Sequence, residues 1–272
     1  MNSGMKTSIR DVLYEPPGPR NQKIITAVTA VSAVALAGLL AAVIRLFYIN
    51  GQLDAKYWTL FTRYTTWRFI CQGLAGTLKA AAGAGVITFA LGMAMMLCRI
   101  SRYRPARAAG TVLVEFTRGV PTLLFIYFFF LIAPQLGITL PAYWKITLPV
   151  AISASGVVAE VLRSGVNAVP SGQSEAALSL GMRDRSVFFK IVFPQAFRYV
   201  IPAMISELVI VLKDTTFAYV VTYADLMQNA KALISNYDAL LSVYLVVAVI
   251  YILINYILNR ISVALSERGK QQ

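Results

Sequence analysis

The chain alternates between long apolar runs and shorter polar segments. The first run, from Ile24 to Ile44, holds twenty-one residues without a charge. At about 1.5 Å per helical residue, a run of this length crosses a hydrocarbon core roughly 30 Å thick. Five further runs lie at about 70–98, 108–132, 146–162, 199–221 and 241–258. The pattern predicts an all-α, polytopic membrane protein with about six transmembrane helices.

The six runs are predicted to form one membrane domain over residues 24–262. Residues 1–23 are basic and rich in proline, so we expect a flexible arm there, with a short tail at 263–272. A cleaved signal peptide is the alternative interpretation of the first run. The apolar region of such a peptide is usually about 7 to 15 residues long, which favours a retained span.

Lysine and arginine are unevenly distributed among the polar segments. The segments before the first run, after the second, after the fourth and after the sixth carry 16 basic residues, and the alternate set carries 6. Because cytoplasmic segments are enriched in Lys and Arg, the first set is expected in the cytoplasm. Both termini and the polar loop at about 164–198 are then cytoplasmic.

Composition supports a membrane protein and argues against a nucleic-acid partner. Hydrophobic residues make up 58% of the chain and charged residues 14%, whereas a typical soluble domain is about 25% charged. The net charge of +13 could indicate nucleic-acid binding, but such a protein needs no series of apolar runs of membrane length. We therefore assign the basic excess to topology and lipid contact.

The sequence lacks the residue types that most covalent chemistry needs. Histidine is absent, which removes Ser-His and Cys-His pairs and the commonest metal ligand. Cys71 and Cys98 lie in or beside an apolar run and have no second thiol at metal-like spacing, so we interpret them as packing residues. We expect no catalytic residue and no metal site.

The polar stretch "SGQSEAALSLGMRD", at 171–184, separates the fourth and fifth predicted spans. Ser171 or Ser174 is placed to cap a short helix whose first turn contains Glu175. Gly181 suits the left-handed position that closes a helix. The stretch therefore predicts a short, separately capped helix on the cytoplasmic side.

A second short helix, "RSVFFKIVF" at 185–193, is predicted to follow it. Asp184 is expected to cap this helix, and Pro194 is expected to weaken or stop it. Two short helices joined by a turn form a compact projection that a partner could contact. An interfacial loop resting on lipid headgroups explains the same pattern equally well.

The segment "EAALSLGMRDRSVFFKIVFPQAFRYVIP", at 175–202, resembles the E-A-A, G and I-x-L-P signature of permease subunits of binding-protein-dependent ABC importers. The glycine falls six positions after Glu175, and Phe193 replaces the usual leucine. In this family the loop forms a coupling helix that docks on a cytoplasmic ATPase subunit. The resemblance implies a type I ABC importer permease-like fold and assigns the coupling role to Glu175, Ala176, Ala177, Leu178 and Gly181.

The same resemblance implies the partners and the location. Two ABC ATPase subunits, a second permease chain that is similar or identical, and an extracytoplasmic substrate-binding protein are expected, in a bacterial cytoplasmic membrane. The sequence contains no G-x-x-x-x-G-K-[ST] phosphate loop. We therefore expect ATP and Mg²⁺ on the partner ATPases and no cofactor bound by this chain.

Several stretches resemble the branch of the family that imports polar amino acids, among them "VEFTRGVPTLL" at 114–124 and "LKDTTFAYVV" at 212–221. The whole chain is similar to the longer permease of actinobacterial glutamate importers, which implies glutamate as the substrate. Ser206 stands where many members have asparagine, and Val157 and Val158 replace an alanine-tyrosine pair. Details of the substrate pocket are therefore expected to differ from those of arginine or glutamine importers.

Ionisable residues inside apolar runs are costly in lipid and tend to face a bundle interior or a cavity. Lys213 and Asp214 interrupt the fifth run and are followed by Thr215 and Thr216. They predict a broken helix whose polar groups line a substrate pathway. Structural contacts with neighbouring helices are an equally good explanation.

Two further charges are candidates for the substrate pathway. Glu160 resembles a family position that meets the substrate amino group, with an ion pair to Arg163 or Arg118 as the alternative. Arg118, like Lys213, is a cation that an acidic substrate would need. It precedes Gly119 and Pro121, which predict a kink in the third span and a possible hinge.

Two other classes of function are open on the residues alone. A self-sufficient secondary transporter or channel would move its substrate without an ATPase or a binding protein. A membrane scaffold would keep the polar loop but would need no charges inside its spans, and the spans contain Lys79, Arg118, Glu160, Lys213 and Asp214. The importer interpretation accounts for both features.

Overall fold

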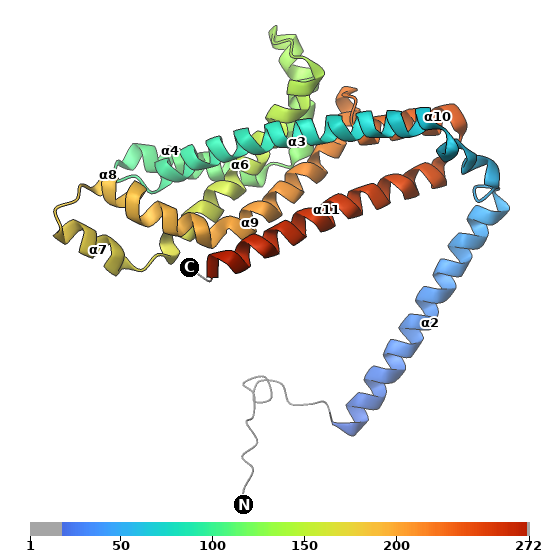
Figure 1. The fold of residues 1–272 in the computed structure, drawn as a ribbon, viewed down its shortest axis with the longest axis horizontal. Helices are drawn as coiled ribbons and strands as arrows, with labels where there is room; N and C mark the ends of the chain where they lie inside the picture. The colour runs from blue at the N-terminus through green and yellow to red at the C-terminus, as the bar shows by residue number, and fades with distance from the viewer. Residues whose placement is uncertain (1–17, 271–272) are drawn as a thin grey trace, which may run out of the picture. The chain divides into compact units, whose positions relative to one another are not determined.

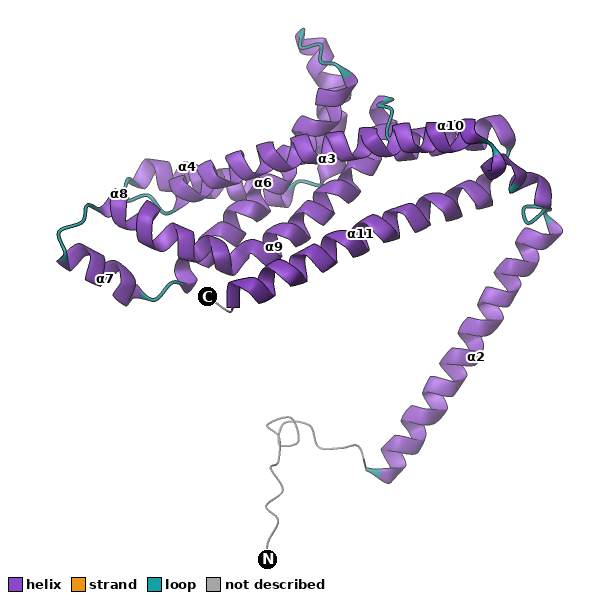
Figure 2. Cartoon of the chain, in the orientation of Figure 1, coloured by secondary structure: helices purple, strands orange, loops and turns teal. Residues whose placement is uncertain are grey.

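A computed structural model describes residues 18–270, with side-chain positions through residue 265. This part of the chain consists of helices and connecting loops and contains no strand, as Figure 2 shows. The expected all-α class is confirmed. Five helices are long and apolar enough to cross a membrane, or six if one bent pair counts as a span. The chain divides after Ala55 into two compact units, which are described separately.

The first unit contains α2, which runs from Pro19 to Ile49. The helix extends the run predicted at Ile24–Ile44 by about one turn at each end. Pro19 occupies its first turn, where a missing N–H costs nothing. The most apolar window of α2 has a mean hydropathy of 2.4, and none of its residues is buried within the described chain. Of the arm predicted at 1–23, residues 1–17 lie outside the described residues, and Pro19 to Lys23 belong to α2.

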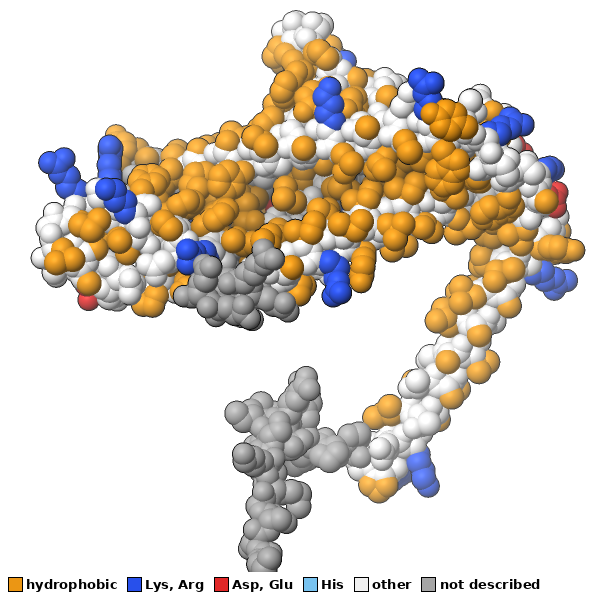
Figure 3. Space-filling model, viewed as in Figure 1, with side chains coloured by type: hydrophobic (Ala, Val, Ile, Leu, Met, Phe, Trp, Pro, Cys, Tyr) orange, Lys and Arg blue, Asp and Glu red, His pale blue; other side chains and the backbone are white. Residues whose placement is uncertain are grey.

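The second unit is a helical bundle that starts at Lys56 (Figure 1). Its α-helices are α3 (Tyr64–Arg99), α4 (Arg104–Gly119), α5 (Thr122–Tyr127), α6 (Ala142–Ala168), α7 (Ser171–Ser179), α8 (Asp184–Val187), α9 (Phe193–Asp214), α10 (Leu226–Tyr237) and α11 (Leu240–Lys270). Helix α6 packs against α3, α4, α5 and α9, so it occupies the centre of the bundle. Apolar side chains cover most of the visible face along α3, α9 and α11 (Figure 3).

Small residues allow the central helices to approach closely. Ala80 and Ala84 of α3 and Ala151 of α6 are fully buried in one apolar cluster. A Cβ atom added to Gly92 of α3 would lie 2.6 Å from Cγ1 of Val158 on α6, so the glycine permits the close contact between these two helices. In a membrane, where helices gain little by hiding apolar surface from lipid, such close packing is the main source of association.

The third span is broken, as the Gly119 and Pro121 pattern predicts. Helix α4 ends at Gly119, and the segment that begins with α5 is bent from it by 96°. After α5 the chain continues through a π-helical segment, Phe128–Ile132, and a 3-10 segment, Ala133–Leu136. The kink is therefore confirmed, whereas movement about it stays a prediction.

The fifth span begins earlier than predicted. Residues 184–221 form one continuous helical element, so the expected separate helix at 185–193 and the span start near Tyr199 are wrong. Pro194 does not stop this helix. A π-helical segment, Phe188–Val192, directly precedes α9 and places Pro194 in its first turn, where a proline is tolerated.

The expected side-chain caps of the polar loop are also wrong. Pro170 takes the N-cap position of α7, and no side chain caps that helix, so neither Ser171 nor Ser174 fills the role. Asp184 is the first residue of α8 and not its cap, and its carboxylate pairs with Arg102 at 3.0 Å. Both helix starts are exposed, so water can satisfy their N–H groups.

The α-helix of the fifth span ends at Asp214, although the helical element continues to Val221. A 3-10 segment, Thr215–Val221, is followed by Thr222 with a left-handed φ of 54° and by α10. Two hydrogen bonds join this segment to α3. The backbone N–H of Leu226 donates to Oγ1 of Thr77 at 3.0 Å, and the Tyr223 side-chain hydroxyl donates to the carbonyl of Gly76 at 3.1 Å. A Cβ atom on Gly76 would lie 2.1 Å from the carbonyl oxygen of Ala224.

Replacing Gly76 with alanine should therefore separate α3 from the broken segment. We expect the G76A variant to lose about 1–3 kcal/mol of stability, because the obstructing atom belongs to the backbone and cannot rotate away. Thermal unfolding in detergent, followed by size-exclusion chromatography, measures the effect. G38A in α2, where a Cβ meets nothing within 4 Å, is the control and should be neutral. Equal unfolding temperatures of the two variants would contradict this packing.

Candidate functional sites

The predicted coupling loop forms a helix with one anchored side and one open side. Ala177 of α7 is 5% exposed and packs in an apolar cluster with Val169, Val187 and Val192. Glu175, Ala176 and Leu178 are exposed. The cluster fixes α7 on the start of the fifth span, and the open side offers an acidic group beside a small and an apolar residue.

Gly181 closes this helix in the way the sequence predicts. Its φ is +79°, in the left-handed region. Its N–H donates to the carbonyl of Leu178 at 2.9 Å, and the N–H of Met182 donates to the carbonyl of Ala177 at 3.2 Å. These two bonds form a Schellman motif, which satisfies carbonyls at the end of α7. Gly181 thus ends the helix sharply and turns the chain toward α8.

A polar cavity lies beside the break in the third span. Its volume is about 280 Å³, and residues of the break, of α6 and of α9 line it. Of the predicted site residues, the structure brings Arg118, Gly119, Pro121 and Asp214 together here. The cavity therefore joins the kink of one span to the end of α9.

Thr122 connects the two broken spans directly. Its hydroxyl donates to Oδ2 of Asp214 at 3.0 Å, and its Oγ1 lies 2.9 Å from the hydroxyl oxygen of Ser153 on α6. Hydrogen bonds to a charged partner are among the stronger side-chain interactions. Thr122 and Ser153 both line the cavity, and neither was singled out in the sequence.

Glu207 is the main functional candidate that sequence reasoning missed. This residue of α9 is 6% exposed and lines the cavity together with Asp214. The spacing of seven residues places the two carboxylates on one face of the helix, two turns apart. That spacing, inside an otherwise apolar run, was the signal that could have identified it.

Glu160 lies outside this cavity and forms ion pairs. Its carboxylate hydrogen-bonds to Arg99 and lies 2.8 Å from Nη2 of Arg163. Arg99 also reaches Glu115 at 3.3 Å. The geometry matches the alternative interpretation of Glu160, with Arg163 as its partner, and a contact with substrate stays a prediction.

Lys213, Thr215 and Thr216 do not line the cavity beside Asp214 either. Lys213 is exposed on α9. The Thr215 hydroxyl donates to the carbonyl of Leu212 at 2.7 Å, and the Thr216 hydroxyl donates to the carbonyl of Lys213 at 2.6 Å. Both hydroxyls thus pair with carbonyls in the last turn of α9. Among the described residues, no group of three or more Cys, Asp or Glu side chains could hold a metal ion.

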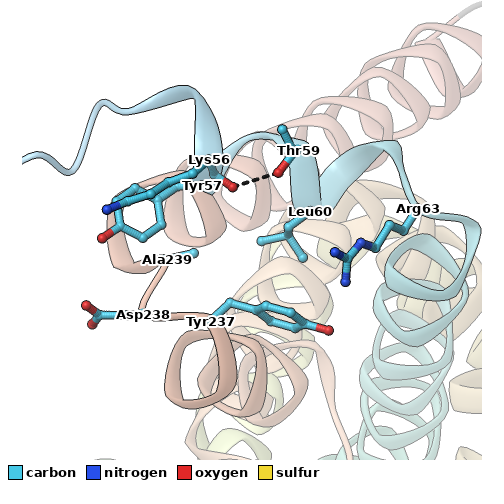
Figure 4. Close-up of a pocket in the computed structure, with 8 residues that line it drawn as sticks. All are labelled: Lys56, Tyr57, Thr59, Leu60, Arg63, Tyr237, Asp238 and Ala239. Carbon is cyan, nitrogen blue, oxygen red and sulfur yellow. Dashed lines mark hydrogen bonds between the residues drawn. The ribbon is translucent and has the colours of Figure 1, made fainter.

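A second polar hollow lies at the end of the bundle opposite α7 (Figures 1 and 4). Its volume is about 320 Å³, and its walls come from the 3-10 segments before α3 and the turn between α10 and α11. Arg63 stacks over the ring of Tyr237, 5.8 Å from its centre, and Asp238 holds a left-handed φ of 53°. Figure 4 shows these side chains among the residues that line the hollow.

The family comparison matches most of this architecture. Residues 86–271 match the model of a family described as the binding-protein-dependent transport system inner membrane component. This interval contains α4 to α11, including both broken spans and α7. The match therefore covers the polar cavity and the loop together.

Individual relatives are similar over about the same region. The glutamate transport system permease protein GluD of Corynebacterium glutamicum is 37% identical over 184 residues, which is 66% of this chain and 67% of that protein. The arginine transport system permease protein ArtQ of Bacillus subtilis is 32% identical over 163 residues, 60% of this chain and 74% of that protein.

Solved structures are similar as well. An amino acid ABC transporter, crystallised with histidines, contains a chain that is 29% identical, with a TM-score of 0.71 over 76% of this chain and 96% of that one. An inward-facing methionine ABC transporter shares the fold, with 16% identity and a TM-score of 0.61 over 75% of this chain and 99% of that one.

Proposed function

Because the chain belongs to the family of binding-protein-dependent transport system inner membrane components, we propose that it is the permease subunit of an amino acid ABC importer. The observation that carries the proposal is the combination of a polar cavity between two broken spans with an exposed helix, α7, at the end of the same bundle. The cavity suits the passage of a polar solute. The exposed helix suits a contact through which an ATPase subunit transmits its movement to the bundle.

Helix α7 is proposed to dock on a cytoplasmic ATPase subunit through Glu175, Ala176 and Leu178. Ala177 and Gly181 act indirectly, since one anchors the helix and the other closes it. ATP and Mg²⁺ are placed on the ATPase, because this chain has no phosphate-binding loop. The permease itself performs no covalent chemistry and binds no cofactor.

The orientation follows from the same assignment. The chain is proposed to span a bacterial cytoplasmic membrane several times, with both termini and α7 in the cytoplasm, as the Lys and Arg distribution indicates. The hollow around Arg63 and Tyr237 then faces outward. An extracytoplasmic binding protein delivers the amino acid on that side, and a second permease chain completes the path.

In this mechanism, ATP binding selects a state in which the two ATPases are closed. The docked α7 helices move with them and bias the bundle toward an outward-open path. The kink at Gly119 to Pro121 is the proposed hinge. The Thr122 to Asp214 hydrogen bond couples that hinge to α9, so both breaks respond together.

Glutamate is the proposed substrate, supported by the likeness to GluD and by two cations, Arg118 in the cavity and Lys213, which is exposed on α9 outside the cavity. A specific observation favours a second candidate, an amino acid with a neutral or basic side chain. Glu207 and Asp214 both line the cavity, so it holds two acidic groups and one basic group. An anionic side chain entering such a cavity meets more repulsion than a neutral or basic one.

Substitutions in the middle of α7 and at the glycine that closes it test the docking contact. G181A forces a non-glycine residue into the left-handed region, which costs about 1–2 kcal/mol and shifts the end of the helix. We expect co-purification with the ATPase and substrate-stimulated ATP hydrolysis to fall about tenfold, and E175K, which reverses an exposed charge, to act similarly. G172A is the matched control, because a Cβ there meets nothing within 4 Å and φ is ordinary. Normal values for G181A and E175K would refute the docking role.

Neutralising the two cations distinguishes the substrates. If glutamate is carried, the double variant R118Q/K213Q should lower its uptake at least about tenfold, because the substrate loses its opposite charges. If a neutral or basic amino acid is carried, the larger loss should follow E207Q/D214N. Radiolabelled glutamate, glutamine and arginine are compared in vesicles, with R68Q, which lies outside the cavity, as control. Unchanged glutamate uptake by R118Q/K213Q would eliminate the acidic-substrate proposal.

A further inference from the structure

A polar groove lies on the surface of the bundle between α9 and α11. Its volume is about 450 Å³. Ser206, Asn255, Tyr256, Asn259 and Ser262 contribute its polar groups, and Ile205, Val209 and Ile210 form its apolar wall. Asn255, Asn259 and Ser262 follow at spacings of four and three on α11, so they form one helical face. This polar face lies within the apolar region that runs from Leu240 to Leu265.

Such a face is not suited to lipid. Asn259 is exposed, and the side-chain Oδ1 of Asn255 is buried without a hydrogen-bond partner among the described residues. In a hydrocarbon environment an amide without a partner is costly, so these groups must face protein or water. The opposite face of α11 carries Leu253 and Ile257, which are exposed and apolar and suit lipid contact. Helix α11 therefore has two chemically different sides.

The groove adjoins the polar cavity. Ile210 lines both, and it lies one turn from Ser206 on α9. Lys213, exposed on the same helix, continues the spacing of four and three residues from Ser206 and Ile210. The stripe thus leads from the level of Asp214 toward the start of α9 and the end of α11. In the proposed orientation both of these ends are cytoplasmic.

We propose that this groove is the inner half of the translocation path, a water-filled passage through which the amino acid leaves the cavity toward the cytoplasm. The inference rests on the proposed importer function. The groove offers amide and hydroxyl groups, whereas the cavity offers carboxylates and an arginine. Neutral polar groups replace hydration water without retaining a charged solute, which suits an exit.

Cysteine accessibility tests the proposal in the assembled transporter. Cys71 and Cys98 are first replaced by alanine, and N259C or I257C is then introduced. The two positions lie at nearly the same depth but on opposite faces of α11. A charged, membrane-impermeant methanethiosulfonate reagent is applied to the cytoplasmic side of inside-out vesicles. We expect N259C to react at least about tenfold faster than I257C, because only a hydrated thiol forms the reactive thiolate, and the transported amino acid should slow the reaction.

Uptake by the cysteine-free parent is measured in parallel, which separates failure of the groove from failure of the proposed function. If uptake is normal but N259C is unreactive or reacts no faster than I257C, the groove is not part of the path. A spontaneous disulfide between N259C residues of two permease chains would also overturn the proposal if the transported amino acid does not slow its formation, because the groove would then be a closed contact between chains. Reaction at N255C with the same protection by substrate would support it.

Discussion

Backbone groups that leave a helix inside a membrane must find partners within the protein, and this requirement determines where the polar groups of the bundle lie. Two spans break, after Gly119 and after Asp214. The second break is held against α3 by the bond from Leu226 to Thr77, and Thr122 ties the first break to Asp214. The polar cavity lies beside the first break and reaches Asp214 at the end of α9. Most polar groups of the cavity therefore lie close to where the two α-helices end.

The same fifth span connects the cavity to the cytoplasmic loop. The chain is helical from Asp184 to Asp214, with a π-helical segment before α9 that accommodates Pro194. Ala177 packs α7 onto the first part of this element. A displacement of α7 thus acts on a continuous helix whose far end carries Asp214. A packed, rigid element of this kind is the physical link that energetic coupling between distant sites needs.

Much of this organisation could be predicted from the sequence, because span length, the kink before Pro121 and the left-handed Gly181 are local properties. The boundary at Asp184 could not, since a proline usually ends a helix and nothing local signals a compensating π-helical turn. Glu160 was assigned to the substrate pathway by likeness, and its partner Arg99 lies 61 positions away in the chain. The spacing of Glu207 and Asp214 places two carboxylates on one face of an apolar helix, but only the fold shows that this face meets the break of another span.

The central claim is that this chain moves an amino acid only as the membrane part of an ATP-driven complex. Reconstitution in liposomes tests it most directly, with the permease alone under an ion gradient compared with the permease, ATPase, binding protein and ATP together. The account predicts no concentrative uptake by the permease alone and uptake by the complete, ATP-supplied system. Gradient-driven uptake by the permease alone, at a rate that the ATPase and binding protein do not change, would contradict it.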